Sequence, residues 1–176
     1  ARYIRDGNCR FEDLRIDGQN LAWAGIFAGS GCLIQNCDIR RCNNNGIIGN
    51  STLGGLEVRQ CRITDGLADG VTVYLNSIVM DNVIENNGDD GLVVSGAGSY
   101  VAGNIVRHNG DNYELAANNQ LNLLIAEVPE LLDQSCSAIL AGTLTCTDTS
   151  TNGITLSASD VTIDLAGHAL IGPGAT

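Results

Sequence analysis

The stretch CLIQNCDI at residues 32–39 decides the fold, because closely related stretches return at even intervals along the chain. They are CRFEDLRI (9–16), LEVRQCRI (56–63), SIVMDNVI (77–84) and YVAGNIV (100–106). The last apolar residues of the five stretches are 23, 24, 21 and 22 residues apart, and they are Ile16, Ile39, Ile63, Ile84 and Val106. A period of roughly 20 to 25 residues is typical of a solenoid, in which each repeat forms one coil that stacks on its neighbours.

A second strand-like series follows three of these anchors in register. It comprises NGIIG (45–49), DGVTV (69–73) and DGLVV (90–94), and the first glycine of each lies seven residues after the preceding anchor. Each coil therefore contains at least two short strands. Leucine-rich repeats have a similar period, but their recurring leucine frame is missing here. We therefore predict an all-β fold, a parallel β-helix solenoid of roughly six to eight coils of 21–24 residues.

The repeats resemble those of the right-handed parallel β-helix superfamily, the pectate-lyase-like group, whose members carry stretches of the form G-I-x-V … x-N-x-I. The resemblance covers residues 8–110 and implies that the solenoid is right-handed. It also implies an inward ladder of asparagines at one turn, which corresponds here to the column Leu14, Cys37, Cys61, Asn82 and Asn104. The architecture serves lyases, hydrolases, epimerases, tailspikes and passive surface proteins, so the fold alone selects no function.

The composition argues against some classes of partner. The chain of 176 residues carries 20 acidic and 9 Lys or Arg residues, which gives a formal net charge of −11. Nucleic-acid binding needs a basic surface, so we expect no nucleic-acid partner. No apolar run approaches the roughly 18 residues that cross a bilayer, so we expect no membrane span. The acidic composition fits a secreted or cell-surface protein, or one that recruits cations.

The seven cysteines are an odd number, so at least one thiol has no partner within the chain. No CxxC pair is present, which argues against a zinc site. Cys37 and Cys61 occupy equivalent positions of successive coils, as do Cys9 and Cys32, and we expect buried thiols at both pairs. Cys136 and Cys146 lie outside the repeat and are the better disulfide candidates.

Polar residues form two columns when the coils are aligned on the glycine that opens the second strand. The column directly before this glycine contains Asn45, Asp69, Asp90 and Asn112, and the column four residues earlier contains Arg41, Asp65, Asn86 and His108. Asp89 and Asp111 lie between the two columns. Stacked carboxylates on Asp69 and Asp90 would repel each other, so we expect them to bind a cation such as Ca²⁺ or to have one raised pKa.

These columns suggest how the protein would act on an acidic polysaccharide. Calcium would hold a substrate carboxylate while a basic residue removes a proton. The candidate catalytic residues are therefore Asp69, Asp90, Arg107 and His108, with Asp69 and Asp90 as the metal ligands. The candidate substrate-binding residues are Asp65, Asp89, Asp111 and Arg62.

A purely structural explanation of the same residues stands beside this one. Asn-Gly and Asp-Gly pairs adopt the positive φ that tight turns require, so a solenoid built on such turns stacks aspartates without any ligand. Among the signatures of pectin hydrolases with this fold, only the Asp-Asp pair is present, at Asp89 and Asp90. The first hypothesis is thus an extracellular β-helix module that binds or acts on an acidic polysaccharide. The alternative is a non-catalytic structural or adhesive β-helix.

Residues 111–135 do not follow the repeat. The spacing of a helical face is found in Leu121, Leu124, Ile125, Val128, Leu131 and Leu132, although Pro129 would interrupt such a helix. A strand over 121–128 is the alternative. We expect residues 111–135 to connect or cap the coils of residues 1–110, and residues 136–176 to add further β-helix strands to the same single domain.

The C-terminal stretch SASDVTIDLAGHALIG (157–172) is similar to the opening coil of β-helices in this superfamily. Three explanations are open. The chain is a circular permutant whose last strands dock beside the first coil, or one unit of a tandem array. In the third, its C-terminal coil completes a neighbouring molecule and builds a homo-oligomer by end-to-end stacking.

Overall fold

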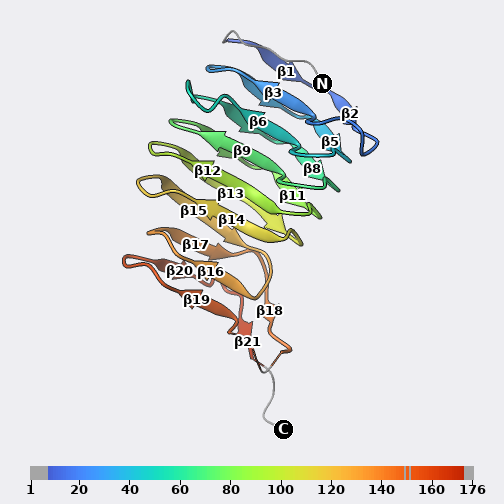
Figure 1. Ribbon diagram of the computed structural model, residues 1–176. Helices are drawn as coiled ribbons and strands as arrows, with labels where there is room; N and C mark the ends of the chain where they lie inside the picture. The colour runs from blue at the N-terminus through green and yellow to red at the C-terminus, as the bar shows by residue number, and fades with distance from the viewer. Residues whose placement is uncertain (1–7, 149, 151, 173–176) are drawn as a thin grey trace.

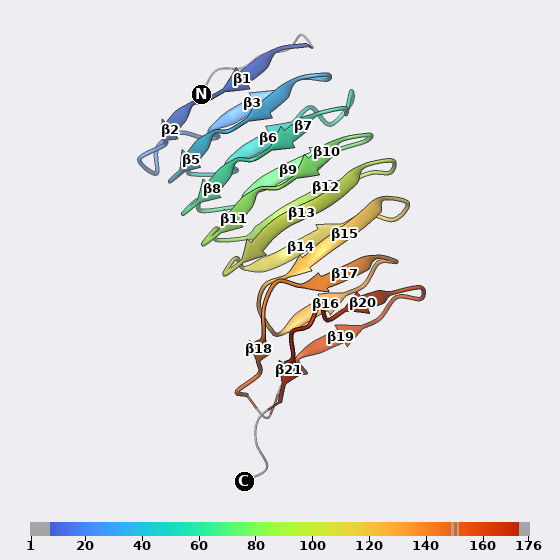
Figure 2. The ribbon, with the colours of Figure 1, turned by 180° about the vertical axis from the view of Figure 1, so that it is seen from behind.

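The protein is a right-handed parallel β-helix of about 7 turns, seen in a computed structural model that describes residues 8–148, 150 and 152–172. The described residues contain strands and no helix. Figures 1 and 2 show the coils stacked along one axis, with the first coil and the last at opposite ends.

Each of the first four coils contributes three short strands. The first strands are β1 (Arg10–Glu12), β4 (Leu33–Gln35), β7 (Glu57–Arg59) and β10 (Ile78–Met80). The second strands are β2 (Arg15–Asp17), β5 (Asp38–Arg40), β8 (Arg62–Thr64) and β11 (Val83–Glu85). The third strands are β3 (Ile26–Ala28), β6 (Ile47–Gly49), β9 (Val71–Tyr74) and β12 (Asp90–Ser95).

In the next two coils the first two strands are fused into one. These coils contain β13 (Tyr100–Arg107) with β14 (Asp111–Leu115), and β15 (Gln120–Ile125) with β16 (Glu130–Leu132). The remaining strands are β17 (Ser137–Leu140), β18 (Leu144–Thr145), β19 (Ile154–Leu156), β20 (Thr162–Asp164) and β21 (Leu170–Ile171). The pairings between coils are parallel, as the solenoid predicts, and β13 pairs with both β10 and β11.

The predicted anchor residues form the central column of the core. Ile16 pairs with Ile39, Ile39 with Ile63, Ile63 with Ile84, and Ile84 with Val106. From Ile39 onward these side chains are at most 1% exposed. Complete burial of one such aliphatic side chain stabilises the fold by about 1.5 to 3 kcal/mol. The apolar positions that repeat in the sequence are therefore the positions that form the core.

The corners of the coils explain the many Asn and Asp residues. The residue between the first and second strands has a positive φ in four successive coils, at Asp13, Asn36, Gln60 and Asp81, and Gly103 has one within the fused strand β13 of the fifth coil. The residue after the second strand has one in four coils, at Arg41, Asp65, Asn86 and His108. Asn, Asp and Gly adopt this left-handed conformation most readily, which accounts for Asp65 and Asn86 in the second polar column. Asp69 and Asp90 of the first column, and the glycines that follow them, are not among the residues with a positive φ.

The predicted inward ladder is present. The backbone N–H of Cys61 donates to Oδ1 of Asn82 at 2.9 Å, and the N–H of Asn82 donates to Oδ1 of Asn104 at 3.1 Å. In the rung of Cys37 a thiol replaces the amide, and the N–H of Cys37 lies 3.5 Å from Sγ of Cys61. Leu14 is in register with this column but is 40% exposed, because it lies in the first coil.

Residues 111–135 continue the stack instead of connecting or capping it. The helix prediction for Leu121 to Leu132 is wrong, and the strand alternative is close to the structure: β15 pairs with β13 and β17, and β16 pairs with β19. Leu121, Leu123 and Ile125 are buried on alternate positions, because successive side chains of a strand point to opposite faces.

The circular-permutant explanation is also wrong. Strand β20 pairs with β17 and β21 pairs with β18, whereas β1 pairs only with β4 among the described strands. The C-terminal strands therefore extend the last coils and lie far from β1 (Figure 1).

The disulfide predicted between Cys136 and Cys146 is not formed. Cys136 precedes β17, whereas Cys146 follows β18 and its N–H bonds to the carbonyl of Ile171 in the last coil. The two residues thus lie at different corners of the coil. Burial raises the pKa of the Cys136 thiol, and at Cys61 the same cause raises the pKa to about 12, so both favour the uncharged thiol.

Candidate functional site

Three aspartates gather at the corner that leads into the third strand. Asp90 opens β12, Asp89 precedes it, and Asp69 occupies the position of Asp90 one coil earlier. One carboxylate oxygen from each of the three lies within 4.8 Å of the others. The alignment predicted that Asp69 and Asp90 stack, and the structure adds Asp89 to the pair.

Asp69 is held in place by one residue of the coil before it and by one residue of its own coil. Its Oδ2 accepts hydrogen bonds from Nδ2 of Asn45 at 2.9 Å and from the hydroxyl of Thr72 at 2.8 Å. The side chain of Asn45 also donates to the hydroxyl of Thr72, so the three polar groups fix one another. The Asp69 carboxylate therefore has a fixed orientation before any ligand binds.

Asp90 is the aspartate of the cluster whose pKa is raised. Partial burial raises its pKa to about 6, and the nearby carboxylates of Asp69, Asp89 and Glu114 act in the same direction. A cation placed between the carboxylates would remove this repulsion. Either predicted consequence of stacking, a raised pKa or cation binding, is thus consistent with the arrangement.

The acidic column continues into the next coil through Asp111. Strand pairing places Asp111 opposite Asp90 and Tyr113 opposite Leu92. The alignment had placed Asn112 in this column and Asp111 outside it, which is wrong by one residue. The cause is that the fifth coil has Asn112 where the earlier coils have Gly91 and Gly70, so the glycine used for the alignment is missing there.

The predicted basic residues are bound to other acids. Nε and a terminal nitrogen of Arg107 lie 2.9 and 2.8 Å from Oε2 of Glu85, and Arg62 contacts the other oxygen of the same carboxylate. Glu85 is only 5% exposed, so both arginines compensate a buried charge. The structure therefore brings Arg62 and Arg107 to each other through Glu85.

His108 and Asp65 lie at corners with positive φ. Nε2 of His108 lies 3.3 Å from a carboxylate oxygen of Glu127, and the backbone N–H of His108 donates to the other carboxylate oxygen of Glu127 at 2.6 Å. Asp65 accepts a hydrogen bond from the hydroxyl of its neighbour Thr64 at 2.9 Å. Both residues have local structural roles.

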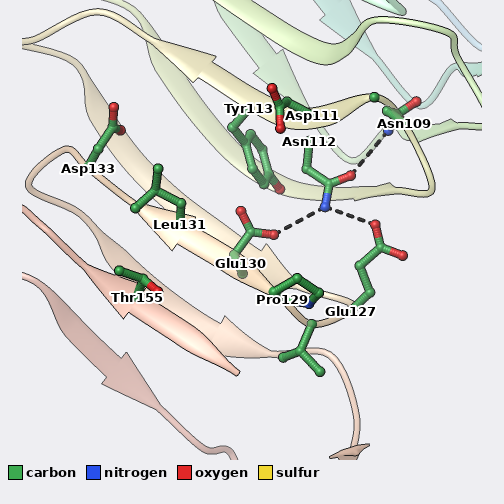
Figure 3. Close-up of a pocket in the computed structure, with 12 residues that line it drawn as sticks. Asn109, Asp111, Asn112, Tyr113, Glu127, Pro129, Glu130, Leu131, Asp133 and Thr155 are labelled. Carbon is green, nitrogen blue, oxygen red and sulfur yellow. Dashed lines mark hydrogen bonds between the residues drawn. The ribbon is translucent and has the colours of Figure 1, made fainter. Parts of the chain in front are cut away.

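A groove of about 720 Å³ lies beside Asp111. The sheet of third strands runs β3, β6, β9, β12, β14 and ends there, because β16 pairs with β19 and not with β14. Figure 3 shows the resulting space, with Tyr113 and Asn112 on one side and Glu130, Leu131 and Pro129 on the other.

Two glutamates of the groove share one amide. Nδ2 of Asn112 donates to Oε1 of Glu127 at 2.9 Å and to Oε2 of Glu130 at 3.2 Å. Burial raises the pKa of Glu130 to about 7, although the hydrogen bond from Asn112 lowers it. The negative charges of Glu127 and Asp111 raise it further. An ionisable group with such a pKa in an open cavity is typical of a functional site.

Comparison with protein families adds an independent observation. The description "right handed beta helix region" matches residues 2–126, which is more than half of the chain. The chain belongs to the right-handed β-helix family. Comparisons with curated proteins and with solved structures found no match. The family establishes the architecture of this β-helix protein and leaves its chemistry to the sites described above.

No described segment of this β-helix protein forms a helix of the length and hydropathy that a membrane-spanning helix needs.

Sequence reasoning missed Glu127, Glu130 and Tyr113. They belong to residues 111–135, which were expected to connect or cap the coils. One signal was available in the sequence. If residues 130–132 form a strand, as residues 121–128 do in the strand alternative, Glu130 and Leu132 face the same side, and a glutamate then occupies a core-facing position.

Proposed function

We propose that this protein is an extracellular β-helix module that binds an acidic polysaccharide through a divalent cation held by Asp69, Asp89 and Asp90. The preferred cation is Ca²⁺. The single observation that carries the proposal is the cluster of three carboxylates whose oxygens lie within 4.8 Å of one another. Calcium binds carboxylate oxygens in flexible geometry and would leave ligand positions for a uronate carboxylate. The acidic surface alone would repel such a polymer.

Binding is favoured over cleavage. Proton abstraction needs a basic group within reach of the substrate, and the two candidates are engaged elsewhere: Arg107 by Glu85 and His108 by Glu127. Asp65 and Arg62 remain candidates for contacts with the polymer along the same flank, and Asp111 extends the acidic column toward the groove. We propose no catalytic step.

The test is a calorimetric titration with Ca²⁺, followed by titration with a polyuronate oligosaccharide in Ca²⁺ and in a chelator. We expect Asp69→Asn and Asp90→Asn to weaken both titrations together. Asp81→Asn is the matched control, because Asp81 is a carboxylate at a different corner with φ 57, which Asn tolerates. Polyuronate binding that persists in the chelator, or that survives both substitutions, would disprove the proposal.

A second candidate is a structural or adhesive module that assembles end to end. The observation that favours it is the apolar surface of the last coils, where Leu156, Leu165, Leu170 and Ile171 are between 41% and 52% exposed. An exposed strand edge with apolar side chains is a template for pairing with a second chain. Measurement of solution mass against concentration decides: Leu170→Lys should abolish any concentration-dependent growth, and a monomer at every concentration contradicts assembly.

A further inference from the structure

The groove is built into the fold by an interruption of one sheet. Strands β13 and β15 are paired directly, with Val106 opposite Ile125, yet the strands that follow them, β14 and β16, are not paired. The two coils therefore separate along the third strand, and the groove widens from a corner where the coils are still in hydrogen-bond contact. Its volume, about 720 Å³, falls within the usual range of small-molecule sites.

Glu130 occupies a position that should be apolar. In β16 the burial alternates, with Glu130 and Leu132 buried and Leu131 exposed, and Glu130 pairs with Ile154 of β19. Glu130 is 8% exposed, and its carboxyl group points toward Asn112 beside Tyr113 (Figure 3). Burying an ionisable group costs stability that an aliphatic side chain would not cost. This position therefore calls for an explanation other than packing.

The other groups of the groove define what it would bind. Asp111, Glu127 and Asp133 also line it, and no Lys or Arg is found among the described residues that do so. Such a lining excludes anions and attracts cations. Among the described residues only Asp69, Asp89 and Asp90 bring three ligand atoms within 4.8 Å, so the carboxylates of the groove are too dispersed to enclose a metal ion. They suit an organic cation with several N–H donors and an apolar body.

The remaining lining is polar in a way that suits hydroxyl groups. Asn109, Asn112 and Thr155 offer donors and acceptors, and Tyr113 offers the edge or face of a ring. Burial raises the pKa of Tyr113, so the phenol remains neutral, and it donates to the carbonyl of Leu124 at 3.4 Å. An extended peptide fits less well, because an added strand needs about 4.8 Å on each side and the direct pairing of β13 with β15 leaves no space for one between those two strands.

We propose that the groove between β14 and β16 binds an amino sugar with a free amine, as part of a glycan, with Glu130 and Glu127 accepting hydrogen bonds from the ammonium group. Asn112 holds the two carboxylates in place for this contact, and the hydroxyls of the sugar bond to the amides and to Asp111. The proposal is independent of the calcium cluster.

The experiment is a calorimetric titration of the full chain with a glucosamine oligosaccharide at about pH 7 and with a chelator present. At lower pH the Glu130 carboxyl, whose pKa is about 7, would be protonated and could not accept a charge-assisted hydrogen bond from the ammonium group. Parallel titrations use the fully N-acetylated oligosaccharide, a glucose oligosaccharide of the same length and oligolysine. We expect binding of the free-amine oligosaccharide alone, and a loss of about tenfold or more in affinity for Glu130→Gln, since a charge-assisted hydrogen bond is lost.

Two further variants keep the outcome clear if Glu130→Gln does not fold. Glu127→Gln removes the second acceptor, and Asp133→Asn removes an exposed carboxylate of the groove; each should weaken binding, while Asp81→Asn at a distant corner should not. Equal affinity for the N-acetylated oligosaccharide overturns the proposal, because the amine is then not recognised. Binding of oligolysine without the sugar, or unchanged binding by all three variants, overturns it as well. Because a chelator is present, failure of the calcium proposal leaves this result unaffected.

Discussion

Nδ2 of Asn82 donates a hydrogen bond of 2.8 Å to Oδ1 of Asn104, one coil further along the β-helix. Both side chains are buried, and each also donates from Nδ2 to a backbone carbonyl, that of Val58 for Asn82 and that of Val79 for Asn104. The two amides therefore tie the turn to the carbonyls of strands β7 and β10 in the preceding coils. Cys61 depends on the ladder as well, since its N–H donates to Oδ1 of Asn82.

We predict that Asn82→Ala lowers the free energy of unfolding by about 1 to 3 kcal/mol, because it removes the acceptor of the buried Cys61 N–H and the bonds to Val58 and Asn104. Urea denaturation measures the loss. The control is Asn122→Ala, whose exposed amide donates to the Tyr100 hydroxyl at 3.4 Å. Equal effects of the two substitutions would show that the ladder contributes nothing of its own.

Gly70 separates two coils that approach closely. A Cβ at Gly70 would lie 2.4 Å from Cγ2 of Ile84 and 2.7 Å from the carbonyl oxygen of Gly91. Both atoms belong to the packed interior, so Gly70→Ala should destabilise the protein by about 1 to 3 kcal/mol through overpacking. Gly142→Ala serves as the control, because nothing lies within 4 Å of a Cβ built there. Thermal unfolding of the two variants checks the difference, and a Gly70→Ala protein as stable as Gly142→Ala would contradict it.

The parts of the fold that follow the repeat could be predicted from the sequence. Ile39, Ile63 and Ile84 stack because each coil buries the same position, and the period reveals that position directly. The proximity of Asp69 and Asp90 follows from the same register. The one-residue error at Asn112 arose where the marker glycine is missing, so the register there depended on strand pairing alone.

The groove could not be predicted, because it depends on a pairing that does not form. The residues Glu130–Leu132 themselves give no indication that β16 pairs with β19 and not with β14. The helical spacing of Leu121 to Leu132 also misled, since apolar residues on both faces of successive strands reproduce a helical pattern over a short window. Tertiary stacking decides between the two structures.

The calcium cluster predicts a stability effect as well as binding. If Ca²⁺ binds the folded protein at Asp69, Asp89 and Asp90, a concentration 100 times the dissociation constant should stabilise it by about 2.7 kcal/mol. We expect Ca²⁺ to raise the unfolding temperature of the wild type and not that of Asp89→Asn or Asp90→Asn, with Asp81→Asn behaving like the wild type. A shift of the same size in all four proteins would place the ion elsewhere.

Glu130 makes a prediction about pH. Its pKa rises from 4.5 to about 7 on folding, mainly through burial, so the folded state favours the protonated form. The contribution of Glu130 to stability is therefore complete below about pH 4.5 and is lost as the pH rises to 7, a loss of up to about 3 kcal/mol. In a chelator, the wild type should lose more stability than Glu130→Gln between about pH 5 and about pH 8. Urea midpoints of the two proteins at each pH give the difference. Because the shift of Asp90 is common to both proteins, it cancels in the comparison, and parallel curves would mean that Glu130 is ionised in the folded state without cost.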